Sequence, residues 1–409
     1  MTIRILGTVI ALCSVVTLAY AQPAAQPPQV ARGQYLAQAG DCISCHTAKG
    51  GAPFAGGYRL DTPFGYMLAP NITPDADTGI GNWSADDFYR AMHEGVNKSG
   101  EYMYPAMPYD FYSKVTREDS DAIYAYLRTL KPVRNAVDVN HLRFPFNQRL
   151  SMAVWRELYF TARTYQADAA KSPAWNRGAY LIEGLAHCSA CHSPHNRMGA
   201  IEKDREFAGA GIDGWFALNL TSDIAAGLGT WTAAEIATYL KTGTYAGKTT
   251  VLGPMAEVVR NSTSHLSDAD LAAMAEYLKS LPADSTLRAG RQILYPERQR
   301  GATVYLSYCS GCHQGDGRGV PGKFPPLAGN PVVTAPTPAN VFKVILGGIP
   351  SRDGYAAMPG FAAQLSNQQI ADLVNYLRAS WGNNAPANAS VTDIISLRPI
   401  TAPPTAASR

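Results

Sequence analysis

The cysteines of this 409-residue chain have a spacing that can do chemistry. Six of the seven form three pairs with two residues between the partners, and a histidine directly follows each pair. The three motifs are Cys42-Ile43-Ser44-Cys45-His46, Cys188-Ser189-Ala190-Cys191-His192 and Cys309-Ser310-Gly311-Cys312-His313. Cys-x-x-Cys-His is the attachment signature of haem c. The two thiols can bond the two vinyl groups of one haem, and the histidine then binds the iron axially.

One isolated motif of this kind also fits a redox-active dithiol or half of a zinc site. Zinc sites, however, more often pair two Cys-x-x-Cys units without the strict histidine. Here the motif occurs three times, and the only other cysteine, Cys13, lies in an N-terminal apolar run. We therefore expect three covalently bound haem c groups, with His46, His192 and His313 as iron ligands.

The second axial ligand in cytochromes c is commonly a methionine. Two methionines lie on loops stiffened by proline, and a third directly follows a proline. They are Met107 in Tyr104-Pro105-Ala106-Met107-Pro108, Met358 in Ala357-Met358-Pro359-Gly360, and Met255 in Gly253-Pro254-Met255-Ala256. We expect these three methionines to be the distal ligands.

Other side chains compete for these positions. Met103 lies close to Met107, and Met274 falls on the core face of a predicted helix. Histidine could replace methionine, and the candidates are His93 and His265, because His187 and His195 lie too near their own motif. The third repeat has no spare histidine. Three methionine ligands would close every iron to substrate and raise its potential, which favours electron transfer over small-molecule catalysis.

The elements that position these ligands repeat along the chain. Each motif follows a short predicted helix, and the lead-in segments are Arg32-Gly33-Gln34-Tyr35-Leu36, Arg177-Gly178-Ala179-Tyr180-Leu181 and, more loosely, Arg300-Gly301-Ala302. A second helix begins at Ser84 and at Thr232, each with a carboxylate three residues later, and at Thr337-Pro338 in the third copy. Glycine ends each of these helices 11 residues later, at Gly95, Gly243 and Gly348.

A last helix closes each repeat. It is predicted to begin at a hydroxyl cap, and a tyrosine follows each cap by 10 residues; the pairs are Thr116 with Tyr126, Ser267 with Tyr277, and Ser366 with Tyr376. These tyrosines could relay electrons, but we interpret them as packing against the haem-bearing helix. The sequence therefore predicts an all-α fold of three tandem cytochrome c-type haem domains, with helices joined by long ordered loops.

Composition and the N-terminus indicate where the chain works. Arg4, the apolar run 5–18 and Ala19-Tyr20-Ala21 predict a signal peptide at 1–21; an uncleaved N-terminal anchor is the alternative interpretation. The formal net charge of +3 is no nucleic-acid signature. Only 16% of residues are charged, whereas 36 Gly and 28 Pro fit short helices joined by long loops.

The predicted organisation follows from these repeats. Domain 1 spans 22–131, a connecting segment 132–173, domain 2 174–285, domain 3 286–383, and an extended tail 384–409. The connecting segment holds Phe144-Pro145-Phe146-Asn147 and then an aromatic helix face with Met152, Trp155, Leu158, Tyr159 and Phe160. We expect this face to pack between domains 1 and 2, although it could also face a partner subunit or a membrane surface.

At this point the sequence resembles a known family, the three-haem cytochrome c subunits of bacterial membrane-bound dehydrogenases that oxidise alcohols, gluconate, sorbitol or aldehydes. The segments that carry the resemblance are Asp41-Cys42-Ile43-Ser44-Cys45-His46-Thr47, Phe54-Ala55-Gly56-Gly57, Pro70-Asn71-Ile72-Thr73-Pro74-Asp75, Thr78-Gly79-Ile80-Gly81, Tyr104-Pro105-Ala106-Met107-Pro108-Tyr109 and Trp175-Asn176-Arg177-Gly178-Ala179-Tyr180-Leu181. The resemblance covers nearly all of the chain after the predicted signal peptide.

The resemblance implies a division of labour. A separate catalytic subunit, with pyrroloquinoline quinone, a flavin or a molybdopterin, would oxidise the substrate. The cytochrome would pass the electrons to ubiquinone or to a terminal oxidase, on the periplasmic face of the inner membrane. Two other functions stay open from the residues themselves: a self-contained haem enzyme with an open iron in domain 2, and a free periplasmic electron shuttle.

Overall fold

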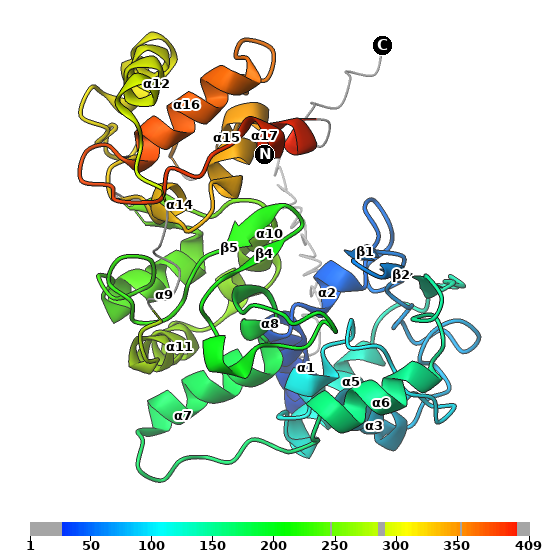
Figure 1. Ribbon diagram of the computed structural model, residues 1–409. Coiled ribbons are helices and arrows are strands. Elements are labelled where there is room, and N and C mark those ends of the chain that lie inside the picture. Colours follow the sequence, from blue (N-terminus) through cyan, green and yellow to red (C-terminus); the bar gives the residue numbers. More distant parts are fainter. Residues whose placement is uncertain (1–26, 246–247, 285–290, 352–353, 399–409) are drawn as a thin grey trace, which may run out of the picture.

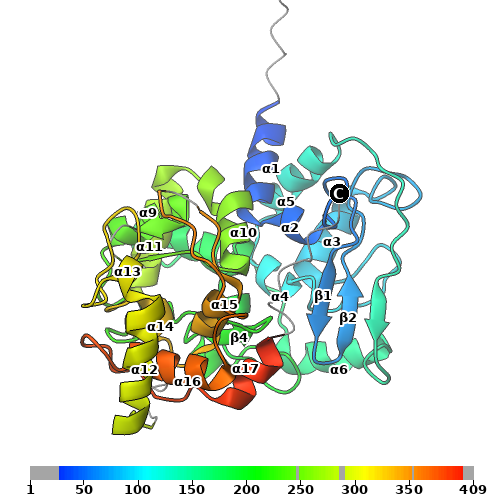
Figure 2. The same ribbon diagram turned by 90° about the horizontal axis from the view of Figure 1, so that it is seen from above.

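The computed structural model describes residues 27–245, 248–284, 291–351 and 354–398. The predicted signal peptide lies outside these residues. The described chain is mostly helical, and we refer to three of its segments as unit 1 (residues 27–131), unit 2 (173–284) and unit 3 (291–383). Unit 2 lies between the other two (Figures 1 and 2).

Units 1 and 2 each add short strands to a set of helices. The elements of unit 1 are α1 (Pro28–Ala39), α2 (Cys42–Cys45), β1 (Arg59–Thr62), β2 (Gly65–Leu68), α3 (Ala85–Glu94), α4 (Tyr109–Tyr112) and α5 (Arg117–Leu127). Those of unit 2 are α7 (Pro173–Tyr180), η1 (Leu181–Leu185), α8 (Ser189–His192), η2 (Lys203–Arg205), β4 (Ala210–Ile212), β5 (Trp215–Ala217), α9 (Ala233–Thr242), β6 (Thr244–Tyr245), β7 (Thr249–Thr250), α10 (Pro254–Asn261), η3 (Thr263–His265) and α11 (Asp268–Ser280).

Within its described residues unit 3 is helical. Its elements are α12 (Tyr295–Tyr308), α13 (Ser310–His313), α14 (Pro331–Thr334), α15 (Ala339–Gly347) and α16 (Asn367–Arg378), and α17 (Val391–Leu397) follows the unit. The prediction of an extended tail is therefore wrong over α17. Ser390 caps this helix by accepting from the Asp393 backbone N–H, and Ile394 is fully buried against unit 3.

The predicted helix boundaries are confirmed where local capping sets them. Ser84 and Thr232 each form a capping box, with Asp87 and Glu235, and Gly95 and Gly243 end these helices in the left-handed conformation. The side chains of Thr116, Ser267 and Ser366 cap α5, α11 and α16 as predicted. In unit 3 the second helix begins one residue late, because Pro338 occupies the cap position instead of the first helical turn.

One helix crossing recurs in all three units. The first helix of each unit packs on the last, which are α1 on α5, α7 on α11 and α12 on α16. A Cβ at Gly33, Gly178 or Gly301 would overlap a backbone oxygen of the partner helix and approach Tyr126, Tyr277 or Tyr376. Glycine therefore permits the close crossing, and the tyrosines pack against the helix that leads into each motif, as predicted.

The strands modify the all-α prediction. In unit 1, β1 and β2 form an antiparallel hairpin, and β3 (Asn140–Leu142) pairs with β2 in the register Tyr66 to His141. The two pairs in unit 2, β4 with β5 and β6 with β7, are also antiparallel. These strands have two to four residues each. Such lengths carry too few alternations for a sequence pattern to reveal them.

The connecting segment folds onto unit 1. Its helix α6 (Leu150–Tyr159) buries Met152 and Trp155 against β2 and the loop around α4. The Trp155 Nε1–H donates to the backbone oxygen of Met198 in unit 2 at 3.0 Å. The predicted packing between units 1 and 2 is therefore correct for this face of α6.

Units 1 and 2 share one hydrophobic core. Leu36, Ile123 and Leu127 of unit 1 lie in the same buried cluster as Leu181 and Leu185 of unit 2. Unit 3 has a separate cluster around α12, α15 and α16. It joins unit 2 where the buried Asn340 side chain bonds both backbone groups of Phe216, at 2.7 and 2.8 Å. Across the described residues, no helix combines the length and apolarity that a membrane span requires.

Candidate functional site

The three motif histidines have the same hydrogen bond. In each unit the imidazole Nδ1 lies within hydrogen-bond distance of a backbone carbonyl, and the pairs are His46 with Pro70 at 2.8 Å, His192 with Leu218 at 2.6 Å and His313 with Pro325 at 3.0 Å. Because a carbonyl oxygen can only accept, the proton must sit on Nδ1. The Nε2 lone pair is then free, which is the arrangement of a metal-ligating histidine.

Burial keeps these imidazoles neutral. Desolvation lowers the pKa of His46, His192 and His313, and the carbonyl bond opposes this effect only in part. Only the neutral form has a lone pair to give to iron. Each motif thus presents one oriented, deprotonated nitrogen to its surroundings.

The carbonyl partners of His46 and His192 belong to a repeated loop whose role the sequence pattern did not reveal. Asn71 and Asn219 follow the carbonyl residues Pro70 and Leu218, and each side-chain oxygen accepts from the N–H two residues on, at 2.9 and 2.7 Å. These Asx turns aim the preceding carbonyl back at the histidine. The signal was present in the duplicated Asn-x-Thr of units 1 and 2, but a loop motif without periodicity does not show which side chain it will meet.

Five of the six motif cysteines lie in poorly hydrated surroundings, whereas Cys312 is exposed. Desolvation by burial raises the pKa of Cys42, Cys45 and Cys188 to about 12, and of Cys191 and Cys309 to about 11. A redox-active dithiol needs a lowered pKa. In the described parts of the chain, no group of three or more His, Cys, Asp or Glu is placed to hold a metal ion. The raised thiol pKa values do not favour a redox-active dithiol.

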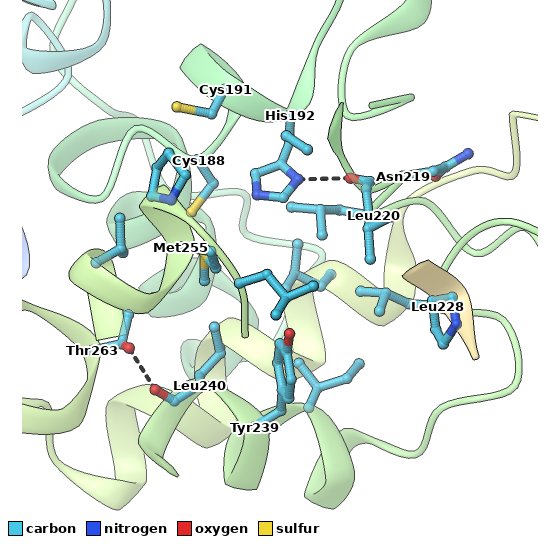
Figure 3. Close-up of a pocket in the computed structure, with 18 of the residues that line it drawn as sticks. Cys188, Cys191, His192, Asn219, Leu220, Leu228, Tyr239, Leu240, Met255 and Thr263 are labelled. Carbon is cyan, nitrogen blue, oxygen red and sulfur yellow. Dashed lines mark hydrogen bonds between the residues drawn. The ribbon is translucent and has the colours of Figure 1, made fainter. Parts of the chain in front are cut away.

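A deep apolar pocket lies in front of the second motif. Cys188, Cys191 and His192 form one side, and the lining continues with side chains from β5, α9, α10 and α11. The His192 ring reaches into the pocket, and Tyr239 and Leu240 line the wall facing it (Figure 3). A flat, largely apolar macrocycle with a nitrogen ligand on one face fits this lining.

The three predicted methionines each pack against the core that contains their own motif. Met107 lies beside the cluster that includes Cys42, Met255 beside the same shared cluster near Cys188, and Met358 beside the unit 3 cluster with Cys309. Met103 instead packs in the separate cluster under α6. The structure therefore separates Met107 from its nearest competitor.

Local backbone structure differs among the three methionines. Met358 lies in a two-bond bridge with Ile349, at 2.9 Å for both bonds, and Met107 is in the loop before α4. Met255 instead occupies the first turn of α10 and lines the pocket. Met274 also lines this pocket, but it is 1% exposed and belongs to the core face of α11, as predicted.

The competing histidines differ in their contacts, and the buried Nδ1 of His93 has no hydrogen-bond partner. The His93 ring stacks on Tyr89, and His265 Nε2 lies 3.1 Å from the Arg260 backbone oxygen. His187 Nδ1 lies 2.7 Å from the Leu185 backbone oxygen, and its ring lines the pocket directly before Cys188. His187 and His265 therefore each have one ring nitrogen at hydrogen-bond distance from a backbone carbonyl.

The attachment segments of neighbouring units lie side by side. Asn261 of α10 donates to the Ser44 hydroxyl of α2 at 2.7 Å, and Ala39 and Asp41 of unit 1 line the unit 2 pocket. Pro331, Val332 and Asn340 of unit 3 line the same pocket. Unit 2 therefore contacts both neighbours at the pocket beside its own motif, and Asp41 of unit 1 lines this pocket together with Cys188 and Cys191.

Comparisons with known proteins agree with this geometry. The family model "Cytochrome c" matches residues 30–131 and 176–282, and the model "Cytochrome C oxidase, cbb3-type, subunit III" matches 296–377. The chain is 40% identical to the alcohol dehydrogenase (quinone) cytochrome c subunit of Gluconobacter oxydans, over 91% of this chain and 83% of the relative.

Two further relatives have similar names. The gluconate 2-dehydrogenase cytochrome c subunit of Pantoea cypripedii is 39% identical, over 93% of this chain and 92% of the relative. The fructose dehydrogenase cytochrome subunit of Gluconobacter japonicus is 36% identical, over 91% and 83%. The chain therefore belongs to the family of cytochrome c subunits of bacterial dehydrogenases, which carry electrons on covalently bound haem c.

Proposed function

We propose that this chain is a periplasmic three-haem cytochrome c, the electron-transfer subunit of a dehydrogenase complex. Its three cytochrome c domains are 22–131, 174–285 and 286–383. The thioether cysteines are Cys42, Cys45, Cys188, Cys191, Cys309 and Cys312. The axial pairs are His46 with Met107, His192 with Met255 and His313 with Met358.

The observation that carries this proposal is the threefold hydrogen bond from motif histidine to backbone carbonyl. Three separate loops orient three imidazoles in the same way, which supports the same role, iron ligation, for each Nε2. The bound haem would supply one-electron chemistry. The protein residues hold it, keep water away from its apolar faces and fix the imidazole tautomer.

Methionine ligation supports electron transfer over catalysis. Three methionines from conformationally restrained segments would close the second face of each iron, so no site would remain for a substrate. The electrons then need a source and a sink outside the chain. The relatives' names support a catalytic dehydrogenase subunit as source. Ubiquinone or a terminal oxidase would be the sink, and the predicted signal peptide 1–21 would deliver the chain to the periplasmic face of the inner membrane.

Haem stoichiometry and spectra test this function directly. We expect three haems per chain by pyridine haemochrome assay against protein mass, and removal of 1–21 by mass spectrometry. Ferric near-infrared spectra should show methionine–iron charge transfer for all three haems, and carbon monoxide should leave the ferrous spectrum unchanged. A carbon monoxide shift on one haem in three would instead favour the alternative of an open iron in unit 2, where methionine lies on a helix.

A further inference from the structure

A second cavity lies between α4, α6 and the loop of unit 2 that follows Met198. It has a volume of about 200 Å³, and its lining includes Asp110, Phe111, Lys114, Trp155, Phe160 and Lys203. We propose that this cavity binds the head group of a lipid-borne quinone and that Asp110 donates a proton to it. The proposal deepens the proposed function and rests on it, because the cytochrome must bring the electrons.

The size of the cavity fits a single substituted ring. An apolar cavity of about 150 Å³ holds benzene, so 200 Å³ leaves room for small ring substituents. Phe111, Trp155 and Phe160 supply aromatic walls, and Trp155 is 4% exposed. A haem would not fit, and none of the three attachment motifs lines this cavity.

Asp110 is an unusual wall residue. Its Oδ1 is buried and has no hydrogen-bond partner, although most buried polar atoms in proteins have one. Desolvation by burial raises the pKa of Asp110 to about 6, against the lowering effects of its backbone hydrogen bonds and of the Lys203 and Lys114 charges. A carboxyl with one unpartnered oxygen in a cavity can serve a ligand as hydrogen-bond and proton donor.

Cationic side chains surround the same space. Lys114, Lys203 and Arg163 line the cavity. The Lys114 Nζ forms an ion pair with the Glu183 carboxylate of unit 2 at 3.1 Å, and the Lys203 Nζ lies 3.5 Å from the Glu206 carboxylate. Their N–H groups are donors for a quinone carbonyl, and their charge favours the extra electron density that reduction brings to the oxygen.

The outer face of α6 supplies a path for an apolar tail. Leu150, Val154 and Leu158 recur every four residues and are 81%, 62% and 64% exposed. Leu158 also lines the cavity, so this apolar stripe leads to its mouth. The helix lies at the outer surface of the molecule (Figures 1 and 2). A polar ring with a long hydrocarbon tail is the ligand that matches a small polar cavity opening onto such a stripe.

The cavity is one short helix away from two attachment motifs. Phe111 of α4 lines it, and the next residue, Tyr112, donates from its hydroxyl to the Gly40 backbone oxygen at 3.1 Å. The Tyr112 ring centroid lies 5.5 Å from that of His187, the residue before Cys188. Electrons held in unit 1 or unit 2 therefore have a short route to a ring in this cavity.

Reduction of a quinone to a quinol needs two electrons and two protons. Two ferrous irons of the cytochrome become ferric, and one quinone takes two electrons and two protons to become a quinol. Both quinone carbonyls become hydroxyls, so two O–H bonds form. The Asp110 carboxyl O–H breaks to give one proton, solvent gives the other, and solvent then reprotonates Asp110.

Stopped-flow oxidation of the full holoprotein tests the site. The cytochrome is reduced, freed of reductant and mixed with short-chain ubiquinone-1 or with ferricyanide while the ferrous haem band is followed. We expect Asp110→Asn to slow oxidation by ubiquinone-1 by about tenfold or more and to leave oxidation by ferricyanide unchanged. Leu158→Glu at the mouth should raise the half-saturating quinone concentration severalfold without changing the limiting rate.

Matched controls and a binding probe separate the outcomes. Asp316→Asn changes an exposed carboxylate in unit 3 and should alter neither rate. An azido-ubiquinone should label peptides from α4 or α6, and excess ubiquinone-1 should prevent the labelling. Equal quinone rates for Asp110→Asn and wild type, or labelling elsewhere, would overturn the assignment.

The same experiment distinguishes failure of this site from failure of the proposed function. A wild-type protein that ubiquinone-1 does not oxidise, but that takes electrons from a dehydrogenase and gives them to a soluble cytochrome, would overturn the quinone site alone. A cavity occupied only by co-purified phospholipid and unaffected by ubiquinone-1 would overturn it too. A protein without three redox-active haems would overturn the function on which the site depends.

Discussion

At the scale of the residue, one hydrogen bond sets what each motif histidine can do. With Nδ1–H given to a carbonyl, the imidazole has one free lone pair and a fixed ring direction. Sequence could predict the iron ligand because the histidine directly follows a Cys-x-x-Cys pair. It could not identify the carbonyl, because Pro70, Leu218 and Pro325 lie 24, 26 and 12 residues away and are not all of one residue type.

Sequence alone also cannot show which methionine meets each predicted iron. Met255 is the predicted methionine ligand at which a variant is most informative. We expect Met255→Ala to open one iron, so that carbon monoxide shifts the spectrum of about one third of the ferrous haem. The methionine charge-transfer band should lose a similar share. Met274→Leu is the matched control in the same pocket and should leave both spectra unchanged. The reverse pattern would assign the ligand to Met274.

Asp110 gives a second prediction at this scale, on stability instead of spectra. Its folded pKa is raised to about 6 by burial, from an ordinary value of 3.8. The neutral carboxyl is therefore favoured on folding, and the wild type loses this stability as pH rises from about 4 through 6. The Asn side chain stays neutral at all pH values. We therefore expect the free energy of unfolding of Asp110→Asn to exceed that of the wild type by about 2–3 kcal/mol at pH 8 and to equal it at pH 4.

Denaturant unfolding of both holoproteins across pH 4–8 measures this difference. A constant offset at all pH values would show that packing, not ionisation, distinguishes the two side chains. Greater stability of the variant at pH 8 together with slower quinone reduction would mean that the carboxyl is retained at a cost to folding. Such a cost is expected of a buried carboxyl whose Oδ1 has no hydrogen-bond partner within the protein.

At the scale of the element, the sequence correctly predicted those helix boundaries that are set by contacts within one turn of the helix. The caps at Ser84, Thr232 and Ser267 act within one helical turn, so the residues that decide each boundary are adjacent in sequence. The helix α17 was missed because its burial depends on Ile394 meeting unit 3, a contact that alanine- and proline-rich composition does not reveal.

The glycine of each first helix was visible as a repeat, but its purpose appears only in the crossing. A Cβ at Gly178 would overlap the Ala273 backbone oxygen of α11, and neither helix backbone can move without disturbing the core. We expect Gly178→Ala to destabilise the protein by about 1–3 kcal/mol despite the better helix propensity of alanine.

Thermal or denaturant unfolding of the holoprotein checks this prediction. Gly315→Ala is the matched control, because a Cβ there meets nothing within 4 Å. The control should unfold like the wild type. An unchanged midpoint for Gly178→Ala would mean that the two helices can separate at little cost, and that the glycine repeat does not reflect the crossing.

At the scale of the whole molecule, units 1 and 2 exchange a pair of equivalent bonds. The Tyr35 hydroxyl of unit 1 donates to Asp270 of unit 2, and Tyr180 of unit 2 donates to Asp119 of unit 1, both at 2.6 Å. Each carboxylate also pairs with the arginine of its own unit's lead-in helix. Unit 3 keeps the intra-unit pair, Arg300 with Asp372, but has Thr303 where the tyrosine would be.

This difference, with the shared core, indicates that the chain is built as a two-unit body plus a third unit. Leu181, Ile182 and Leu185 of unit 2 are at most 1% exposed and lie in one cluster with Leu36, Ile123 and Leu127 of unit 1. Separating the two units would expose most of this cluster, at roughly 25 cal/mol per Å² of apolar surface. Unit 3 has its own cluster, so its removal leaves that core intact.

We therefore expect a chain truncated after Asp284 to fold, to mature with two haems and to keep a cooperative unfolding transition. A chain truncated after Lys131 should be unstable, because it loses the unit 2 half of the shared core and the bond from Tyr180 to Asp119. Haem per chain and the unfolding transition of the exported proteins measure both outcomes. A stable one-haem fragment ending at Lys131, or an aggregated two-unit fragment, would contradict this division, since either result would mean that the folding unit is not the pair that shares the core.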